Sequence, residues 1–217
     1  MKRIITIDGP ASSGKTTVAK LLAERLNCVV LESGAFYRVV TYFLIKNGKT
    51  LKEVDFKEVF EELKRVLRVR LHLKGTDLYL EGKKLDLELR SKEVENLVSE
   101  VAAIKEVRDW ITQLIRDLVK DYDCVIAEGR DMGSVVFPEA RLKVFLTADE
   151  KIRAKRRAVQ FFSEKSVEEV EKVIKKRDSI DSQRKVAPLV IPDGALVIDT
   201  SNVTPEEVVE KILSTLQ

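Results

Sequence analysis

The chain has 217 residues, of which 44% are hydrophobic and 35% are charged, and this favours one α/β domain with an insertion over two independent domains. The formal net charge is only +3, so bulk charge gives no reason to expect a nucleic acid or a membrane as a partner. No apolar stretch reaches the length of a membrane span and no signal peptide is recognisable, so a cytoplasmic location is expected.

The N-terminal segment predicts a phosphate-binding loop between a strand and a helix. Residues 3–8 are rich in β-branched side chains, and helical spacing begins directly behind the loop. An ordinary β–α turn would need neither a lysine nor a threonine, whereas a nucleoside triphosphate site uses both, with backbone N–H groups around the phosphates. The loop has the spacing Gly-x4-Gly-Lys-Thr and comprises Gly9, Pro10, Ala11, Ser12, Ser13, Gly14, Lys15, Thr16 and Thr17.

Strands and helices alternate along most of the chain, which favours a parallel sheet with helices on both faces. Residues 28–31 are predicted as a strand, and residues 35–46 and 54–67 as helices. Alternating apolar residues then indicate an antiparallel hairpin, and we interpret residues 63–100 as an insertion. Cys28 and Cys124 each open an apolar run and are expected to be buried strand thiols, because no metal-binding spacing accompanies them.

The second half of the chain continues the alternation. A capping box of Thr204 and Glu207, with Pro205 at the first helical position, starts the final helix. The other predicted elements are a helix at residues 105–120 and strands at residues 124–127, 142–146 and 195–198.

Three segments place polar residues where ligands of such folds bind, at the carboxyl edge of the sheet. They are residues 33–38, residues 129–133 and a helix at residues 166–185, which begins with a capping box of Ser166 and Glu169. One face of this helix becomes charged towards its end, which fits either a substrate-facing stripe or ordinary ion pairs on a surface. The residues of that face are Val170, Ile174, Arg177, Asp181 and Arg184.

The preceding helix carries Arg153, Arg156 and Arg157 on one face. These arginines fit either a basic surface patch or a lid that brings guanidinium groups over a transferring phosphoryl group. The phosphate loop alone does not identify a reaction, since switch GTPases, motor ATPases and small kinases share it. A guanine-binding Asn-Lys-x-Asp signature is absent from the sequence, and the short chain favours a kinase that acts on a small substrate.

In order along nearly the whole chain, residues 9–17, 33–38, 128–138 and 177–189 resemble the bacterial cytidylate kinase family. The resemblance implies a P-loop NTPase three-layer α/β fold with a parallel five-stranded sheet, plus a small antiparallel insertion in the region that binds the nucleoside monophosphate. It implies transfer of the ATP γ-phosphoryl group to CMP or dCMP, with Mg²⁺ as cofactor, by a monomer. The implied division is core with P-loop at 1–62, insertion at 63–100, core at 101–148, lid and CMP-contacting helices at 149–188, and core at 189–217.

The resemblance also implies residue roles. Lys15 and the loop amides would hold the donor phosphates, and Thr16 would hold Mg²⁺. No general base is required, because the acceptor phosphate oxygen is already anionic near neutral pH. The catalytic residues implied are Lys15, Arg130, Arg153 and Arg157. The implied CMP-binding residues are Arg38, Arg130 and Arg184 for the phosphate, Arg177 and Asp181 for the sugar, Ser99, Arg108 and Asp131 for the base, together with Ser33.

Two alternatives stay open from the sequence. One is another small P-loop kinase that acts on a different monophosphate or on a small hydroxyl substrate, for which Asp8 or Glu32 would serve as the base. The other is a nucleotide-gated binding protein that hydrolyses ATP slowly to control a partner.

Overall fold

A computed structural model of the protein describes residues 3–160 and 166–216. Residues 1, 2 and 217 of the predicted core and residues 161–165 of the predicted lid lie outside the described residues. The strands are β1 (Arg3–Asp8), β2 (Val29–Glu32), β3 (Leu67–His72), β4 (Gly75–Leu80), β5 (Lys83–Leu85), β6 (Cys124–Gly129), β7 (Leu142–Thr147) and β8 (Leu196–Asp199). The α-helices are α1 (Lys15–Leu26), α2 (Ser33–Lys46), α3 (Phe56–Val66), α4 (Lys92–Val101), α5 (Lys105–Leu118), α6 (Glu150–Gln160), α7 (Val167–Gln183) and α8 (Pro205–Ser214).

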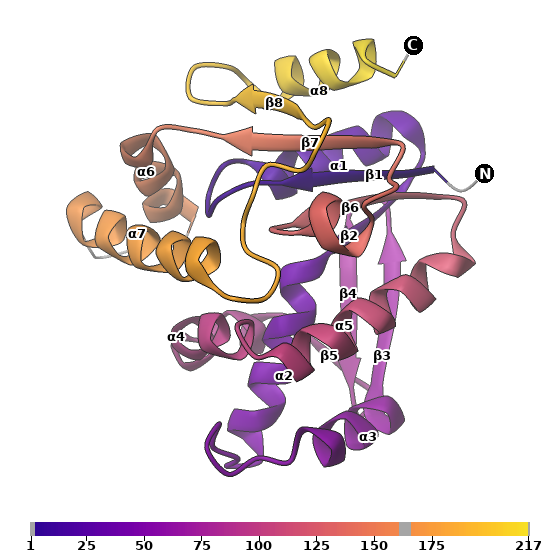
Figure 1. Cartoon of the computed structure of the whole chain (residues 1–217), viewed down its shortest axis with the longest axis vertical. Helices are drawn as coiled ribbons and strands as arrows, with labels where there is room; N and C mark the ends of the chain where they lie inside the picture. Colours follow the sequence, from indigo (N-terminus) through magenta and orange to yellow (C-terminus); the bar gives the residue numbers. More distant parts are fainter. Residues whose placement is uncertain (1–2, 161–165, 217) are drawn as a thin grey trace.

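The strands form one mixed sheet in the order β5-β4-β3-β2-β6-β1-β7-β8 (Figure 1). The pairs β2–β6, β6–β1, β1–β7 and β7–β8 are parallel, whereas β3, β4 and β5 pair antiparallel. The α/β class is confirmed. Strands β2, β6, β1, β7 and β8 are parallel, and the antiparallel strands β3, β4 and β5 of the insertion extend the same sheet to eight strands. The reason is that β2 would otherwise be an edge strand with unpaired backbone groups, and β3 pairs with it antiparallel through Val30 and His72.

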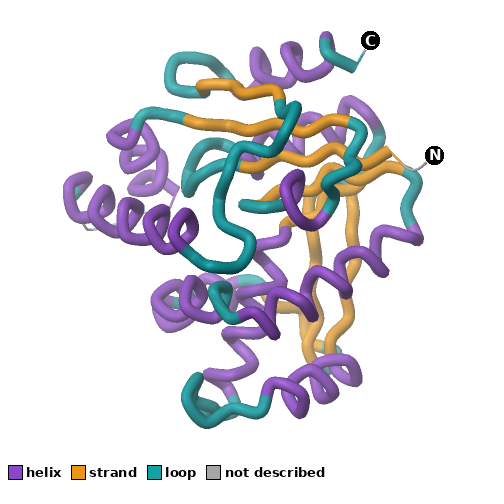
Figure 2. The backbone as a smooth tube through the Cα atoms, viewed as in Figure 1, coloured by secondary structure: helices purple, strands orange, loops and turns teal. Residues whose placement is uncertain are grey.

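Two apolar clusters lie on the two faces of the sheet. Helices lie outside both faces (Figure 2). In β6, Val125 and Ala127 belong to the cluster that α2 and α5 cover, while Ile126 belongs to the cluster beneath α1 and α8. This alternation follows from the two-residue period of a strand and buries β6 on both sides. Within residues 3–160 and 166–216, no helix is both long and apolar enough to span a bilayer.

Helix α4 was not predicted, because the only periodicity recognised in the 63–100 insertion was the strand-like alternation of apolar residues from Val69 to Leu80. The structure ends that alternation at β5 and starts α4 behind Ser91, whose side chain accepts a hydrogen bond from the N–H of Val94. Val94, Val98 and Val101 are buried at helical spacing on one face of α4. The cap and this spacing were therefore a readable signal for the helix.

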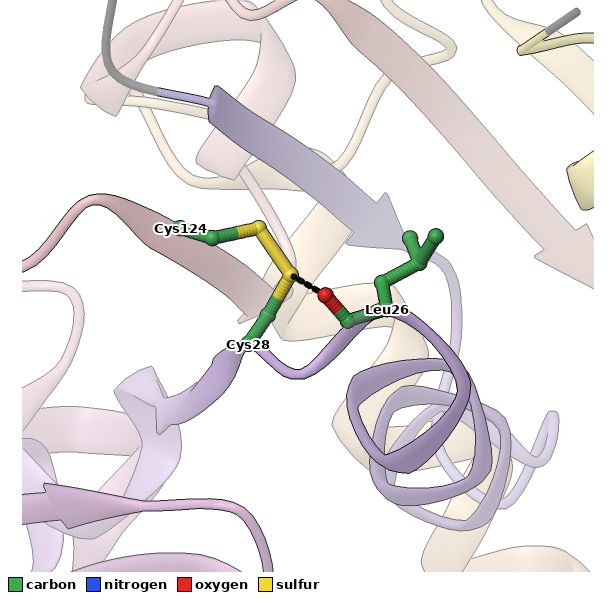
Figure 3. The surroundings of a disulfide bond; sticks show 3 residues. All are labelled: Leu26, Cys28 and Cys124. Carbon is green, nitrogen blue, oxygen red and sulfur yellow. Dashed lines mark hydrogen bonds between the residues drawn. A yellow bond between two sulfur atoms is a disulfide. The ribbon is translucent and has the colours of Figure 1, made fainter.

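The two cysteines form a disulfide bond rather than remaining thiols, so the expectation of buried thiols was wrong (Figure 3). Cys28 precedes β2 and Cys124 begins β6, and their Cα atoms lie 4.7 Å apart although 96 residues separate them. This spacing lies in the range of disulfides. Parallel pairing of β2 with β6 brings the two cysteines together, and each one alone gave no sign of the other.

Candidate active site

A cavity of about 590 Å³ opens at the carboxyl ends of β1, β2 and β6, in the volume range typical of small-molecule sites. It extends from the phosphate loop to the N-terminal half of α5. Of the predicted site residues, Gly9, Pro10 and Arg153 do not line it. Those that line it are Ala11, Ser12, Ser13, Gly14, Lys15, Thr16, Thr17, Ser33, Arg38, Ser99, Arg108, Arg130, Asp131, Arg157, Arg177, Asp181 and Arg184.

The phosphate loop has the backbone geometry that its glycines predict. Gly9 has φ +150°, and a Cβ there would collide with the carbonyl oxygen of Leu146, so the backbone of β7 packs against the loop at this position. Gly14 has φ +95° at the N-cap of α1, a conformation that L side chains avoid. The loop backbone therefore has no side chain at these two positions, and the first N–H groups of α1 have no partner within the helix.

Lys15 and Thr16 begin α1 inside the cavity. The ammonium of Lys15 donates to the carbonyl oxygen of Pro10 at 2.7 Å. Burial, together with the positive charge of Arg130, lowers the pKa of Lys15 to about 7. The hydroxyl of Thr16 donates to Glu128 Oε1 at 3.2 Å, so two oxygen ligands of the kind Mg²⁺ prefers lie side by side.

Arg153 lies behind the phosphate loop instead of over the cavity. Its guanidinium donates to the carbonyl oxygens of Ala148 and Ala11, each at 3.1 Å, and forms an ion pair with Asp178. Asp178 also accepts a hydrogen bond from the N–H of Ala11 at 3.0 Å. This arrangement attaches α6 and α7, which lie side by side in Figure 1, to the backbone of the loop. The predicted catalytic role of Arg153 stays a prediction.

The far end of the cavity contains a buried ion pair. Arg108 Nη2 lies 2.5 Å from Asp131 Oδ2, and 3% of each side chain is exposed. The Arg108 guanidinium also donates to Ala102 O at 2.8 Å and lies 5.1 Å from the centre of the Tyr37 ring. Burial disfavours the charge of Arg108, but Asp131 outweighs it and the pKa of Arg108 is raised. This end can therefore offer both donors and acceptors to a polar ring.

Arginines occupy the middle of the cavity, between its two ends. Arg130 Nε donates to Asp181 Oδ2 at 2.9 Å, and Arg184 Nη1 lies 3.6 Å from the other oxygen of Asp181. Burial opposes the charge of Arg130, but Asp181 and Glu128 raise its pKa overall. The charged end of the α7 stripe thus faces the cavity, while Val170 and Ile174 pack into a small apolar cluster with Ala11. Arg177, Asp181 and Arg184 thus form ion pairs that line the cavity.

The two carboxylates considered as general bases differ in position. Asp8 is fully buried and accepts hydrogen bonds from the N–H groups of Met132 at 2.8 Å and Gly133 at 2.7 Å. Burial raises its pKa to about 6. Glu32 lines the cavity, and Lys20 lies 3.2 Å from its Oε1. Asp8 is therefore occupied in holding the 131–133 turn.

Sequence reasoning missed several residues of the site. Glu128 and Asp178 lie within recognised motifs, but neither received a role. Arg156 shares a face of α6 with Arg153 and Arg157 but is not among the catalytic residues that the resemblance implies. It lines the cavity and donates to Thr200 O at 2.6 Å. Glu95 contacts three of the arginines from the unpredicted helix α4, and nothing in the local sequence indicates this.

Comparisons with known proteins identify the family of this chain. The model of the cytidylate kinase family matches residues 5–217. A cytidylate kinase of Fervidobacterium nodosum is 44% identical over 212 residues, which are 96% of this chain and 94% of that protein. A cytidylate kinase of Fusobacterium nucleatum subsp. nucleatum is 40% identical over 212 residues, with the same coverage of 96% and 94%. A solved shikimate kinase from Bacteroides thetaiotaomicron shares the fold, with a TM-score of 0.50 at 13% identity and coverage of 100% and 99%. This chain therefore belongs to the cytidylate kinase family.

Proposed function

We propose that this protein transfers the γ-phosphoryl group of ATP to CMP or dCMP, giving ADP and CDP or dCDP, with both nucleotides in the single cavity described above. One observation carries the residue-level proposal: the same cavity joins a phosphate loop to the buried pair of Arg108 and Asp131, with guanidinium groups between them. A nucleotide at each end would place its phosphates among those charges, one set facing the other.

The loop end would hold ATP. The N–H groups of the loop and of the start of α1 surround the phosphates, and Lys15 turns from Pro10 to the β- and γ-phosphates. Thr16 and Glu128 would supply oxygen ligands for Mg²⁺, and the ion would supply positive charge to the phosphates of ATP. Two protein oxygens suit Mg²⁺, because this ion keeps several waters and phosphate oxygens among its ligands.

The opposite end would hold CMP. Asp131 accepts from the exocyclic amine of cytosine, while Arg108 and Ser99 reach the other polar atoms of the base. Arg177 and Asp181 bind the sugar, and Ser33 lies beside the phosphate. Arg38, Arg130 and Arg184 bind the acceptor phosphate, which a guanidinium fork matches in shape.

Transfer then needs alignment and charge neutralisation more than proton chemistry. The acceptor oxygen is already anionic, so no side chain has to remove a proton. Arg157 lines the cavity from α6 and would stabilise the transferring group, whereas Arg153 would act through the backbone of the loop. A monomeric state, a cytoplasmic location and the lack of nucleic-acid or membrane partners belong to this proposal as well.

The test is coupled ADP formation with CMP, dCMP, UMP, AMP and shikimate as acceptors. CMP or dCMP is expected to be the best acceptor. A better rate with another monophosphate or with shikimate would refute the proposed substrate. ATP turnover that does not change when CMP is added would favour the nucleotide-gated binding protein instead.

A further inference from the structure

A single carboxylate holds three arginines of the cavity together. Glu95 lies in α4, and its Oε1 is 2.7 Å from Arg38 Nη1 of α2. Its Oε2 is 2.8 Å from Arg157 Nη2 of α6 and 3.4 Å from Arg177 Nη1 of α7. Helix α2 is far from α6 and α7 in the sequence, and Glu95 is the point where guanidinium groups from all three helices meet.

The electrostatics identify this place as an anion site. The guanidinium groups repel one another. Burial, together with the charges of Arg130 and Arg38, therefore lowers the pKa of Arg177 to about 10. Burial disfavours the charge of Glu95, but the arginines overcome it and lower the pKa of Glu95. Only 19% of the Glu95 side chain is exposed. A carboxylate therefore stabilises positive charges that would otherwise be stacked with little water between them.

The same arginines are those proposed to hold substrate. Arg38 is assigned to the acceptor phosphate, Arg157 to the transferring group and Arg177 to the sugar. Glu95 thus engages groups on both sides of the phosphoryl transfer. Its position on α4 is one helical turn before Ser99, which lines the base end of the cavity.

We propose that Glu95 is an internal counter-anion that occupies the arginine cluster in the ligand-free enzyme and is displaced by the phosphate of the acceptor nucleotide. The inference rests on the proposed function and adds a residue that determines affinity. A phosphate dianion can replace the carboxylate because it carries more charge and more acceptor oxygens. Cytidine, which has no phosphate, cannot replace the carboxylate, and neither can a weaker anion. Because a phosphorylated acceptor has to displace the carboxylate, Glu95 lowers the apparent affinity of the enzyme for that acceptor.

The experiment uses Glu95→Gln, which removes the charge and keeps the shape. The matched control is Glu93→Gln, the same change at an exposed position on the same helix. Both proteins and the wild type are melted with increasing inorganic phosphate, with sodium chloride at matched ionic strength as reference. Initial rates then give KM for CMP, KM for ATP and kcat.

For Glu95→Gln we expect a lower melting temperature without phosphate, because the arginines lose their counter-anion, and recovery as phosphate is added. We expect KM for CMP to fall about three- to tenfold, because CMP no longer has to displace a carboxylate. The change in KM for ATP should be smaller, and Glu93→Gln should behave like the wild type. If Glu95 had only a structural role, phosphate would not restore the melting temperature of Glu95→Gln, and its KM for CMP would be unchanged or higher. This result would overturn the inference.

A second variant covers loss of folding. Glu95→Asp keeps the charge but withdraws it by one methylene, and an intermediate phosphate response is expected. If both variants fold only in phosphate, the inference is supported; if neither folds even then, Glu95 is not exchangeable and the inference fails. Wild-type protein that does not phosphorylate CMP would refute the proposed function itself, independently of the behaviour of the variants.

Discussion

Replacing Asp131 by asparagine removes one negative charge from the far end of the cavity and keeps the shape of the side chain. Arg108 lies 2.5 Å from one Asp131 oxygen, and Arg184 lies 3.7 Å from the other. The exposed fraction of Asp131 and Arg108 is 3% for each side chain. The carboxylate therefore balances guanidinium charge where little water reaches, and its remaining acceptor capacity is available to a base.

The expected magnitude follows from what asparagine retains. Deleting one partner of a buried ion pair costs about 3–5 kcal/mol, but the amide oxygen of asparagine can still accept from Arg108. For CMP, what is lost is the hydrogen bond from the cytosine amine to a charged acceptor, which corresponds to about 1.5–3 kcal/mol of transition-state stabilisation. At 1.4 kcal/mol for each factor of ten, kcat/KM for CMP should fall about ten- to hundredfold. UMP should lose less, because uracil presents a carbonyl where cytosine presents an amine, and the asparagine amide can donate to it.

The assay is coupled ADP release at saturating ATP, with CMP and with UMP, together with KM for ATP and the melting temperature. Asp109→Asn is the matched control, since Asp109 pairs with Lys105 on the exposed side of α5. The CMP-to-UMP ratio of kcat/KM should fall for Asp131→Asn only, while KM for ATP stays close to that of the wild type. Equal losses for CMP and UMP would refute the base-reading role and leave Asp131 a structural residue.

Lys15→Ala should abolish measurable transfer while unfolding stays cooperative, because Lys15 contacts Pro10 O and no apolar cluster; loss of the folded state would contradict the assignment of the loop. The pKa of Lys15 is about 7 in the folded protein against 10.5 for an ordinary lysine, so the ligand-free protein holds it largely neutral at pH 8. ATP binding at pH 8 should therefore take up close to one proton, which calorimetry in two buffers of different ionisation enthalpy measures, and Lys15→Ala should remove the uptake. The same shift makes the Lys15 contribution to stability rise between about pH 7 and 10.5, because only the unfolded chain binds that proton there. Replacing both Cys28 and Cys124 by serine should lower the free energy of unfolding by up to about 4–5 kcal/mol, because the bridge closes a long loop. The activity of that variant at moderate temperature should persist, since the bridge lies at the opposite ends of β2 and β6 from the cavity. Urea unfolding measures the stability and the coupled assay measures the activity. An unchanged free energy of unfolding would contradict the stabilising role of the bridge.

Features that depend on neighbouring residues could be predicted from the sequence. The capping boxes at Ser166 and Thr204 are present, and α7 and α8 begin directly behind them. The shape of the phosphate loop could be predicted for the same reason, because it depends on a few consecutive dihedral angles and two glycines. The sharing of one face by the residues of the α7 stripe could also be predicted, since residues three and four apart on a helix lie on one side, whereas the direction of that face was left open.

Pairings across long stretches of chain could not be predicted in this way. The extension of the sheet to eight strands depends on the β2–β3 pairing, and the disulfide depends on two strands that the chain visits 96 residues apart. The contact of Asp178 with the N–H of Ala11 spans 167 residues. In each case the residues near one partner in the sequence are compatible with several other partners, so they do not identify the contact that forms.

The sequence by itself therefore determined the phosphate loop, the alternation of strands and helices, and the motifs that identify the family, because each of these is encoded over a short stretch. Only the tertiary structure decided which charges meet: Glu95 with three arginines, Asp178 with the loop, and Arg153 behind the loop rather than over the cavity. The physical reason is that an ion pair depends on distance in space, which the sheet order and helix packing set, whereas a loop or a helix cap depends on adjacent backbone geometry.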